Sequence, residues 1–184
     1  MKTGKSILNN KRFQLTILRL CHQLLEQYPQ MKNTCIIGIQ EKGVLLAERI
    51  YQVMTQDLKI RNLKKGKLDI TFYRDDFRRR EDPLKASRTE VDFLVEGMNV
   101  ILIDDVLYTG RTMHAAITAL LDFGRPATVE SLCLVDRRFN RQYPIYADYF
   151  GIRVDALDQA YVRVYWEDID GEDSVSLFSD KQTK

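Results

Sequence analysis

Two adjacent acidic residues and a short turn rich in hydroxyl groups lie close together in the sequence. The acids are Asp104 and Asp105, and the turn runs from Thr109 to Thr112. Carboxylates suit the vicinal hydroxyls of a sugar, or a divalent metal bound to those hydroxyls. Unpaired amides at the start of a helix, with the helix dipole behind them, favour a phosphate. The segment therefore predicts a site for a sugar phosphate of the ribose 5-phosphate kind.

A strand and a helix are needed to hold these groups, and the flanking residues predict both. Asn99–Ile103 carries the apolar run of a buried strand, and Arg111–Phe123 has helical spacing and is ended by Gly124. Gly110 lets the backbone approach a ligand closely. The predicted phosphate segment comprises Asp104, Asp105, Val106, Leu107, Tyr108, Thr109, Gly110, Arg111 and Thr112.

The acidic pair has a simpler interpretation, in which one residue caps a helix and the other is a solvated neighbour. We favour the functional interpretation because strand, acids, small turn and helix occur together in the required order. Two other nucleotide-binding patterns are absent, since the chain has no G-x-x-x-x-G-K-[ST] loop and no G-x-G-x-x-G after a strand.

Alternating strand and helix patterns run through the rest of the chain. Helices are predicted over Lys11–Tyr28, Gly43–Leu58 and Arg111–Phe123, and strands over Thr34–Ile39, Leu68–Tyr73, Asn99–Ile103, Thr128–Val135, Ala147–Ile152 and Tyr161–Tyr165. This alternation predicts an α/β fold with a mostly parallel central sheet flanked by helices. Ligands bind such sheets at the carboxyl ends of the strands, where we expect the loops Gln40–Gly43, Asp104–Arg111 and Asp136–Arg141 to meet.

Length and composition favour one ordinary domain over residues 1–184. The net charge of +2 gives no general attraction to nucleic acid. Cys21, Cys35 and Cys133 sit in apolar runs without metal-binding or redox spacing, which favours a reducing compartment. With no apolar stretch of membrane-spanning length and no signal-peptide pattern, cytoplasm is the expected location.

The segment Ile101–Thr112 resembles the phosphoribosyl pyrophosphate (PRPP) loop of type I phosphoribosyltransferases. Its form Asp-Asp-Val-Leu-Tyr-Thr-Gly-Arg-Thr is typical of members that regulate pyrimidine operons and also act as uracil phosphoribosyltransferases. Further matches lie at Asp69–Asp76, Leu134–Arg137, Pro144–Ile145 and Ala147–Tyr149, so the resemblance covers roughly Leu15 to Trp166. It implies the fold of that family, with a flexible hood loop at about 74–90 and an acidic tail at about 167–184.

The resemblance also implies a role for each segment. Asp104 and Asp105 would hold the ribose hydroxyls, and Thr109–Thr112 the 5-phosphate, with Mg²⁺ bridging pyrophosphate and ribose oxygens and held by the two acids only indirectly. With Arg137, the two acids form the expected catalytic set. Further expected residues are Gln40, Glu41, Lys42 and Gly43 at the pyrophosphate, Tyr73, Arg74, Asp75 and Asp76 at the start of the hood, and Asp136, Arg137 and Arg138 beside the base.

Two departures from the family pattern bear on activity: one is in the pyrophosphate turn, and the other is the loop after Asp136-Arg137, which looks one residue longer than the common form and lacks its Gly. The family usually has Thr-Arg-Gly in the pyrophosphate turn, whereas this chain has Glu41-Lys42-Gly43, which keeps a cation but loses the planar guanidinium. Tyr108 stands where purine-specific relatives have a carboxylate, which argues against a purine base. The expected reaction joins uracil to PRPP and yields UMP and pyrophosphate.

An RNA-binding role is a second expectation from the resemblance. Arg19, His22, Arg138 and Arg141 would contact a pyrimidine-operon leader RNA in a UMP-dependent way, although Arg19 and His22 are equally consistent with a solvated helix face. Three hypotheses stay open: the enzyme, a nucleotide-sensing RNA-binding regulator with little or no catalysis, and a phosphoribosyltransferase for another base. The family forms homodimers and homotetramers, and either is expected here.

Overall fold

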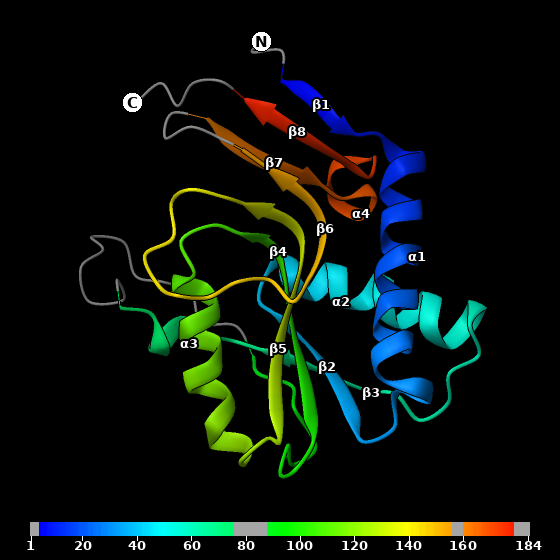
Figure 1. The fold of residues 1–184 in the computed structure, drawn as a ribbon, viewed down its shortest axis with the longest axis vertical. Helices are drawn as coiled ribbons and strands as arrows, with labels where there is room; N and C mark the ends of the chain where they lie inside the picture. Colours follow the sequence, from blue (N-terminus) through cyan, green and yellow to red (C-terminus); the bar gives the residue numbers. More distant parts are fainter. Residues whose placement is uncertain (1–3, 76–87, 156–159, 179–184) are drawn as a thin grey trace.

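Two β-sheets organise the protein in its computed structural model, which describes residues 4–75, 88–155 and 160–178 (Figure 1). The larger sheet has five parallel strands in the order β3-β2-β4-β5-β6. They are β2 (Thr34–Ile39), β3 (Lys64–Leu68), β4 (Asn99–Leu107), β5 (Thr128–Arg137) and β6 (Tyr149–Val154). Helices cover both faces, so the predicted α/β fold with a parallel central sheet is confirmed.

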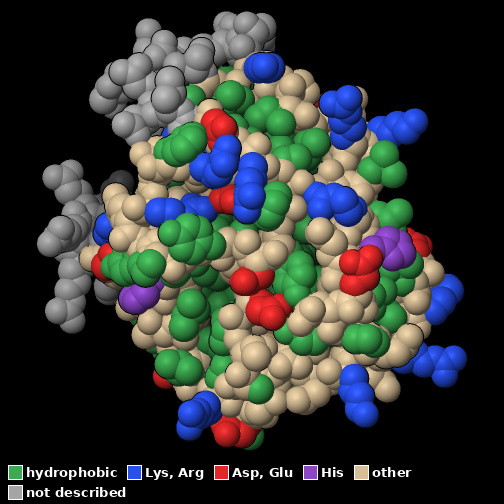
Figure 2. Space-filling view, in the orientation of Figure 1, with side chains coloured by type: hydrophobic (Ala, Val, Ile, Leu, Met, Phe, Trp, Pro, Cys, Tyr) green, Lys and Arg blue, Asp and Glu red, His purple; other side chains and the backbone are tan. Residues whose placement is uncertain are grey.

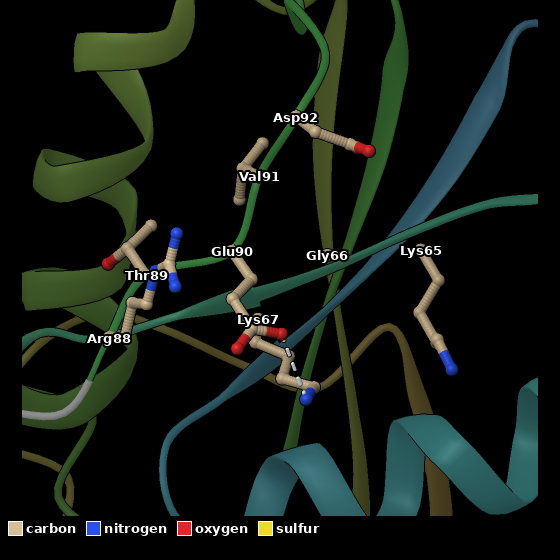
Figure 3. Close-up of a pocket in the computed structure, with 8 residues that line it drawn as sticks. All are labelled: Lys65, Gly66, Lys67, Arg88, Thr89, Glu90, Val91 and Asp92. Carbon is tan, nitrogen blue, oxygen red and sulfur yellow. Dashed lines mark ion pairs between the residues drawn. The ribbon is translucent and has the colours of Figure 1, made fainter.

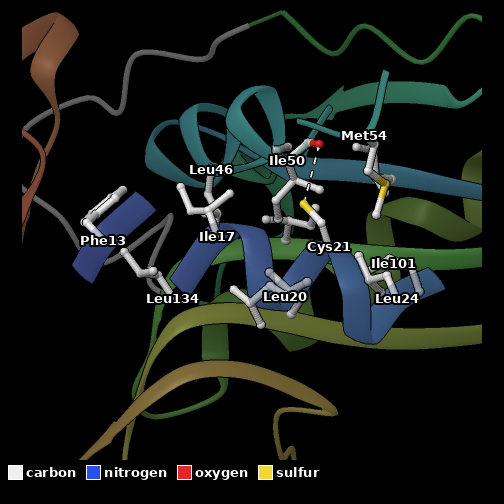
Figure 4. Close-up of a cluster of buried hydrophobic side chains, with 14 of the residues drawn as sticks. Phe13, Ile17, Leu20, Cys21, Leu24, Leu46, Ile50, Met54, Ile101 and Leu134 are labelled. Atoms are coloured by element: carbon white, nitrogen blue, oxygen red, sulfur yellow. Dashed lines mark hydrogen bonds between the residues drawn. The ribbon is translucent and has the colours of Figure 1, made fainter. Parts of the chain in front are cut away.

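Helices α1 (Asn10–Gln27) and α2 (Lys42–Gln52) cover one face of this sheet. Helix α1 begins where the side chain of Asn9 accepts a hydrogen bond of 3.0 Å from the amide of Arg12. Its residues Phe13, Ile17, Leu20 and Leu24 recur at helical spacing and are fully buried. Figure 4 shows that these side chains meet apolar side chains of α2 and of the sheet.

Helix α3 (Arg111–Leu120) covers the opposite face. Successive strand residues point to opposite faces, so Ile101 and Ile103 of β4 pack towards α1 and α2, whereas Val100 and Leu102 pack towards α3. Strand β4 is therefore buried on both sides, as its apolar run predicts. Across the described residues, no helix combines the length and the apolar character that crossing a membrane requires.

A small antiparallel sheet joins the two ends of the chain. It contains β1 (Lys5–Leu8), β8 (Ser174–Phe178) and β7 (Tyr161–Tyr165), in that order, and the short helix α4 (Glu167–Asp170) connects β7 to β8. Trp166 is fully buried and meets Phe13 of α1 edge-on, with ring centroids 5.4 Å apart. The buried carboxylate of Asp173 accepts a hydrogen bond of 2.7 Å from Gln14, which ties this sheet to α1.

One predicted strand, Leu68–Tyr73, was wrong. The strand ends at Leu68, and Thr71–Tyr73 forms a 3-10 turn. The carboxylate of Asp69 accepts hydrogen bonds from the amide of Thr71 at 2.9 Å and from its hydroxyl at 2.6 Å, a local turn that stops the strand. The polar residues Lys64–Lys67 form the strand instead, at the edge of the sheet, where lysines are common.

The other predicted elements exist with shifted ends. Helix α2 stops at Gln52 and continues as a π-helical turn over Val53–Asp57, and α3 continues as a 3-10 turn over Leu121–Phe123. Strands β4 and β5 run further than predicted, to Leu107 and Arg137, and β6 lies at Tyr149–Val154 rather than Ala147–Ile152. Most of the predicted hood loop, 76–87, and the end of the predicted tail, 179–184, lie outside the described residues.

We predict that Gly43→Ala destabilises the protein, because an added Cβ would overlap the carbonyl oxygen of Ile103 and approach the Cα of Asp104 to 3.0 Å. Overpacking against fixed backbone typically costs about 1–3 kcal/mol, which urea unfolding measures. Gly66→Ala is the matched control, since its added Cβ would meet the end of the Val91 side chain at 3.0 Å. Equal losses in the two variants would contradict the proposed packing of α2 against β4.

Candidate functional site

The three loops expected to converge do meet at the carboxyl ends of the strands. Gly43, at the start of α2, packs directly against the backbone of β4 beside Asp104. On the other side of β4, the guanidinium of Arg137 lies 3.8 Å from the centre of the Tyr108 ring. The ends of β2, β4 and β5 therefore form one rim that carries most of the predicted site residues.

The turn after β4 has the geometry expected of an anion cradle. Gly110 has φ +87 and immediately precedes α3, a left-handed conformation that a glycine adopts without strain. The side chain of Thr109 accepts a hydrogen bond of 3.4 Å from the amide of Arg111, while Thr112 lies in the first turn of α3. The helix therefore presents its amino end at the same rim.

The acidic pair lies within β4, not beyond its end as predicted, because the strand continues to Leu107. The Asp104 carboxylate accepts a hydrogen bond of 2.9 Å from the amide of Asp105. Burial, together with the neighbouring Asp105 charge, raises the pKa of Asp104 well above its ordinary value. Burial also raises the pKa of Asp105, although the positive charge of Lys42 opposes that shift. The hydrogen bonds and positive charges nearby thus do not fully offset the desolvation cost of ionising these two carboxylates.

Donor chemistry decides which metal could be held there. Within residues 4–75, 88–155 and 160–178, no group of three acidic, histidine or cysteine side chains could hold a metal ion. Two carboxylates offer the oxygen ligands that a hard cation such as Mg²⁺ prefers, but too few for a cage made by the protein alone. The residues therefore fit a cation that arrives with further oxygens from a ligand.

The predicted pyrophosphate turn lies beside the acidic pair. Its Gln40–Glu41 peptide is cis, α2 begins at Lys42, and the side chain of Glu41 is exposed. The ammonium of Lys42 donates a hydrogen bond of 3.3 Å to the carbonyl of Val164 in β7. Lys42 therefore links this turn to the small sheet while remaining close enough to act electrostatically on Asp105.

The start of the predicted hood contacts the predicted phosphate turn. Asp75 pairs with Arg111 at 2.7 Å and accepts a hydrogen bond of 3.3 Å from the Tyr143 hydroxyl. The positive charge of Arg74 acts on Asp104, and the Tyr73 hydroxyl donates to Asp122, which raises the pKa of that tyrosine. Asp76 lies outside the described residues.

The predicted base-side residues divide into two groups. Asp136 and Arg137 are the buried last residues of β5, at 5 % and 6 % exposure. Arg138 is exposed and makes a two-point contact with Asp155, at 2.6 and 2.7 Å. Figure 2 shows Lys and Arg side chains gathered on this face below the small sheet, with acidic side chains among them.

The four residues predicted for RNA contact are in different situations. His22 is exposed on α1, whereas Arg19 donates hydrogen bonds to the carbonyls of Phe150, at 3.1 Å, and Gly151, at 2.5 Å. The Arg141 side chain is only 16 % exposed and is directed into the rim rather than to open solvent. Arg138 and His22 are thus accessible, and Arg141 is largely not.

Sequence reasoning missed residues of the loop between β5 and β6. The amides of Gln142 and Tyr143 donate to the carbonyl of Thr109 at 2.9 and 3.2 Å, and the side chain of Gln142 accepts from Arg111 at 2.9 Å. The Tyr143 ring stacks on His114, with centroids 4.5 Å apart. These contacts join residues far apart in sequence, and no local pattern signals them.

A groove of about 490 Å³ lies along the outer edge of β3 (Figure 3). It is lined by Lys65, Gly66, Lys67, Arg88, Thr89, Glu90, Val91 and Asp92. Its two lysines are already paired, Lys65 with Glu48 and Lys67 with Glu90, the latter at 3.0 Å. We assign the chemistry to the rim instead, because the acidic pair and the anion cradle lie there.

We predict that Asp104→Asn stabilises the ligand-free protein at neutral and alkaline pH. A raised pKa means that the folded chain holds this proton more tightly than the unfolded chain. Ionisation therefore costs folding free energy as pH rises above the ordinary value of 3.8. Urea unfolding at about pH 4 and about pH 8 should show little difference from wild type at the lower pH and a gain at the higher one. Asp155→Asn, at an exposed ion pair, is the control. A gain that does not depend on pH would refute this explanation.

Comparisons with known proteins agree with this geometry. The model of the phosphoribosyl transferase domain family matches residues 3–167. The protein named "Bifunctional protein PyrR" of Oceanobacillus iheyensis is 41% identical over 181 residues, covering 97% of this chain and 99% of that one. The protein of the same name from Caldicellulosiruptor bescii is 38% identical over 177 residues, covering 96% of each.

Solved structures show the same fold. The hypoxanthine phosphoribosyltransferase of Trypanosoma cruzi superposes with a TM-score of 0.71 at 15% identity, over 97% of this chain and 98% of that one. A hypoxanthine phosphoribosyltransferase from Staphylococcus aureus gives 0.70 at 19% identity, over 97% and 93%. With the acidic pair, the glycine turn and these matches in place, the chain belongs to the phosphoribosyl transferase domain family and, within it, to the PyrR proteins.

Proposed function

We propose that the protein transfers the phosphoribosyl group of PRPP to uracil, giving UMP and pyrophosphate. The observation that carries the proposal is the position of two carboxylates with raised pKa values shortly before the Gly110 turn and the amino end of α3. One end of that arrangement suits a sugar diol and the other suits a phosphate. We assign the reaction to the cytoplasm and to a single domain spanning 1–184 that assembles as a homodimer or homotetramer.

The substrate would lie along the rim with each part facing a different loop. The hydroxyls of ribose would donate to Asp104 and Asp105, and its 5-phosphate would accept from Thr109–Thr112. The pyrophosphate would lie over the turn Gln40–Gly43, next to the acidic pair. The ammonium of Lys42 donates to the Val164 carbonyl at 3.3 Å, a neutral contact that a pyrophosphate would replace with a charged one.

Bond cleavage at the anomeric carbon places negative charge on the departing pyrophosphate and positive charge on the sugar. Lys42 and Arg137 would stabilise the leaving group, while the ionised acidic pair would hold the ribose and favour the oxocarbenium-like sugar. Mg²⁺, which fits the two carboxylates only together with ligand oxygens, would neutralise charge on the pyrophosphate. The N1 nitrogen of uracil forms the new bond and releases its proton.

Tyr108 supports a pyrimidine base. Its ring lies under the guanidinium of Arg137, 3.8 Å from centroid to carbon, so it packs beside the base-side strand. A neutral phenol is a poor general base near neutral pH. Uracil N1–H is itself fairly acidic, so a site without a carboxylate at this position suits uracil better than hypoxanthine or guanine.

We predict that a base screen with PRPP and Mg²⁺ releases pyrophosphate with uracil and not with hypoxanthine or guanine. Lys42→Met should raise the KM for PRPP on the order of tenfold, as loss of one charged contact implies. Lys42→Arg should keep most of the affinity. Tight UMP binding without turnover of uracil would contradict the enzymatic function and favour a nucleotide-sensing regulator. Turnover of a purine would favour a phosphoribosyltransferase for another base.

We further propose that the protein binds pyrimidine-operon leader RNA in response to UMP. The observation in favour is Arg138, which is fixed by Asp155 and lies over the ring of Phe139, 5.4 Å from its centre. Phe139 is 71 % exposed and has φ +81, an uncommon conformation for a bulky residue. An exposed guanidinium beside an exposed ring offers a stacking surface for an unpaired base.

We predict that affinity for a leader hairpin in the presence of UMP falls steeply with salt. Arg138→Ala should lower the affinity and reduce the salt slope by roughly one unit for one lost phosphate contact. Arg19→Ala should have a smaller effect, because that side chain already serves two carbonyls. Arg61→Ala, an exposed arginine remote from the rim, is the control. Unchanged binding after Arg138→Ala would count against this face.

A further inference from the structure

Arg141 and Asp136 form a largely buried ion pair behind the phosphate turn. Their side chains are only 16% and 7% exposed. Arg141 comes from the loop after β5, whereas Asp136 belongs to β5 itself. Burying two charges costs desolvation free energy, which their attraction offsets only when the geometry is good and further hydrogen bonds satisfy both groups. What the pair contacts therefore indicates what it is for.

The guanidinium of Arg141 joins this carboxylate to the backbone of the phosphate turn. One terminal nitrogen donates to Asp136, and the other donates to the carbonyl of Tyr108 and, at 3.4 Å, to that of Arg137. The second oxygen of Asp136 accepts from Arg153 at 3.2 Å. Only a planar guanidinium can serve a carboxylate and backbone carbonyls in this way, since an ammonium lacks the fixed fork.

Contacts from the same loop hold the next peptide of the turn. The carbonyl of Thr109 accepts from the amides of Gln142 and Tyr143 at 2.9 and 3.2 Å. The loop between β5 and β6 thus holds two successive carbonyls, of Tyr108 and Thr109, on one side of the turn.

Because peptide groups are planar, these held carbonyls also fix the directions of the amides that follow them. In a planar trans peptide the C=O and N–H groups point in opposite directions, and among the described residues only Gln40–Glu41 is cis. Holding the carbonyls of Tyr108 and Thr109 therefore directs the amides of Thr109 and Gly110 away from this loop. Neither amide donates to a backbone acceptor within the described part of the chain.

We propose that Arg141, held by Asp136, is a positioning residue for the phosphate turn, which it keeps with its amides directed at the sugar phosphate. The inference rests on the proposed function, because it concerns the turn assigned there to the 5-phosphate. It gives Arg141 a role inside the rim in place of the RNA contact expected from the sequence. Binding of ribose 5-phosphate then needs no rearrangement of the backbone, and the affinity is preserved.

Calorimetric titration with ribose 5-phosphate tests the proposal without requiring any turnover. Arg141→Lys and Asp136→Asn should each weaken binding about tenfold. The double variant should be little worse than either, since both substitutions disrupt the same ion pair. Inorganic pyrophosphate should bind all variants like wild type, because its proposed turn is held by other contacts. Arg49→Lys is the matched control. Arg49 also pairs with a buried carboxylate, that of Asp173 at 3.6 Å, but this ion pair does not belong to the phosphate turn.

The outcomes separate this inference from the proposed function. Ribose 5-phosphate binding that is lost in Arg141→Lys and kept in Arg49→Lys supports the positioning role, even if uracil is not a substrate. Equal affinities in wild type, Arg141→Lys and Asp136→Asn overturn it. Parallel losses for ribose 5-phosphate and pyrophosphate, with a lowered melting temperature, also overturn it, because they indicate a merely structural ion pair.

Discussion

The packing of α2 against the end of β4 is the constraint on which the site depends. Gly43 lies so close to the carbonyl of Ile103 that no larger side chain fits without displacing backbone. This contact brings the turn Gln40–Gly43 beside the acidic pair, and it also lets Lys42 act on Asp105. Because β4 is held by β2 on one side and β5 on the other, the rim cannot shift without disturbing the centre of the sheet.

The charges at the rim are only partly balanced by the side chains of the protein itself. Burial makes the ionised forms of Asp104 and Asp105 costly, and nearby cations only partly compensate. Arg111 is meanwhile satisfied by the Asp75 carboxylate at 2.7 Å, in the position where a phosphate would compete for it. Ionisation of the acids thus lowers the stability of the folded protein, and in the proposed function the binding of hydroxyls, phosphate and a cation would restore it.

Local pattern was sufficient for those parts of the molecule whose partners are close in sequence. The buried run of β4, the start of α3 at Arg111 and the apolar stripe of α1 follow from residue type and spacing alone. The edge strand β3 was missed because its lysines predict a solvated loop, although lysines are also common on edge strands. Contacts such as Lys42 with Val164, or Arg141 with Tyr108, depend on how distant segments pack, and no signal in either segment predicts its partner.

The pairing of β1 with β8 has a consequence for how the protein is made. These strands come from opposite ends of the chain and are hydrogen-bonded neighbours. As the polypeptide leaves the ribosome, β1 has no partner until Ser174–Phe178 has been synthesised. The small sheet, whose strand β7 carries the Val164 carbonyl that receives Lys42, is therefore completed only after all strands of the parallel sheet have been synthesised. A chain cut short before β8 therefore carries the phosphate turn but cannot complete this sheet over the rim.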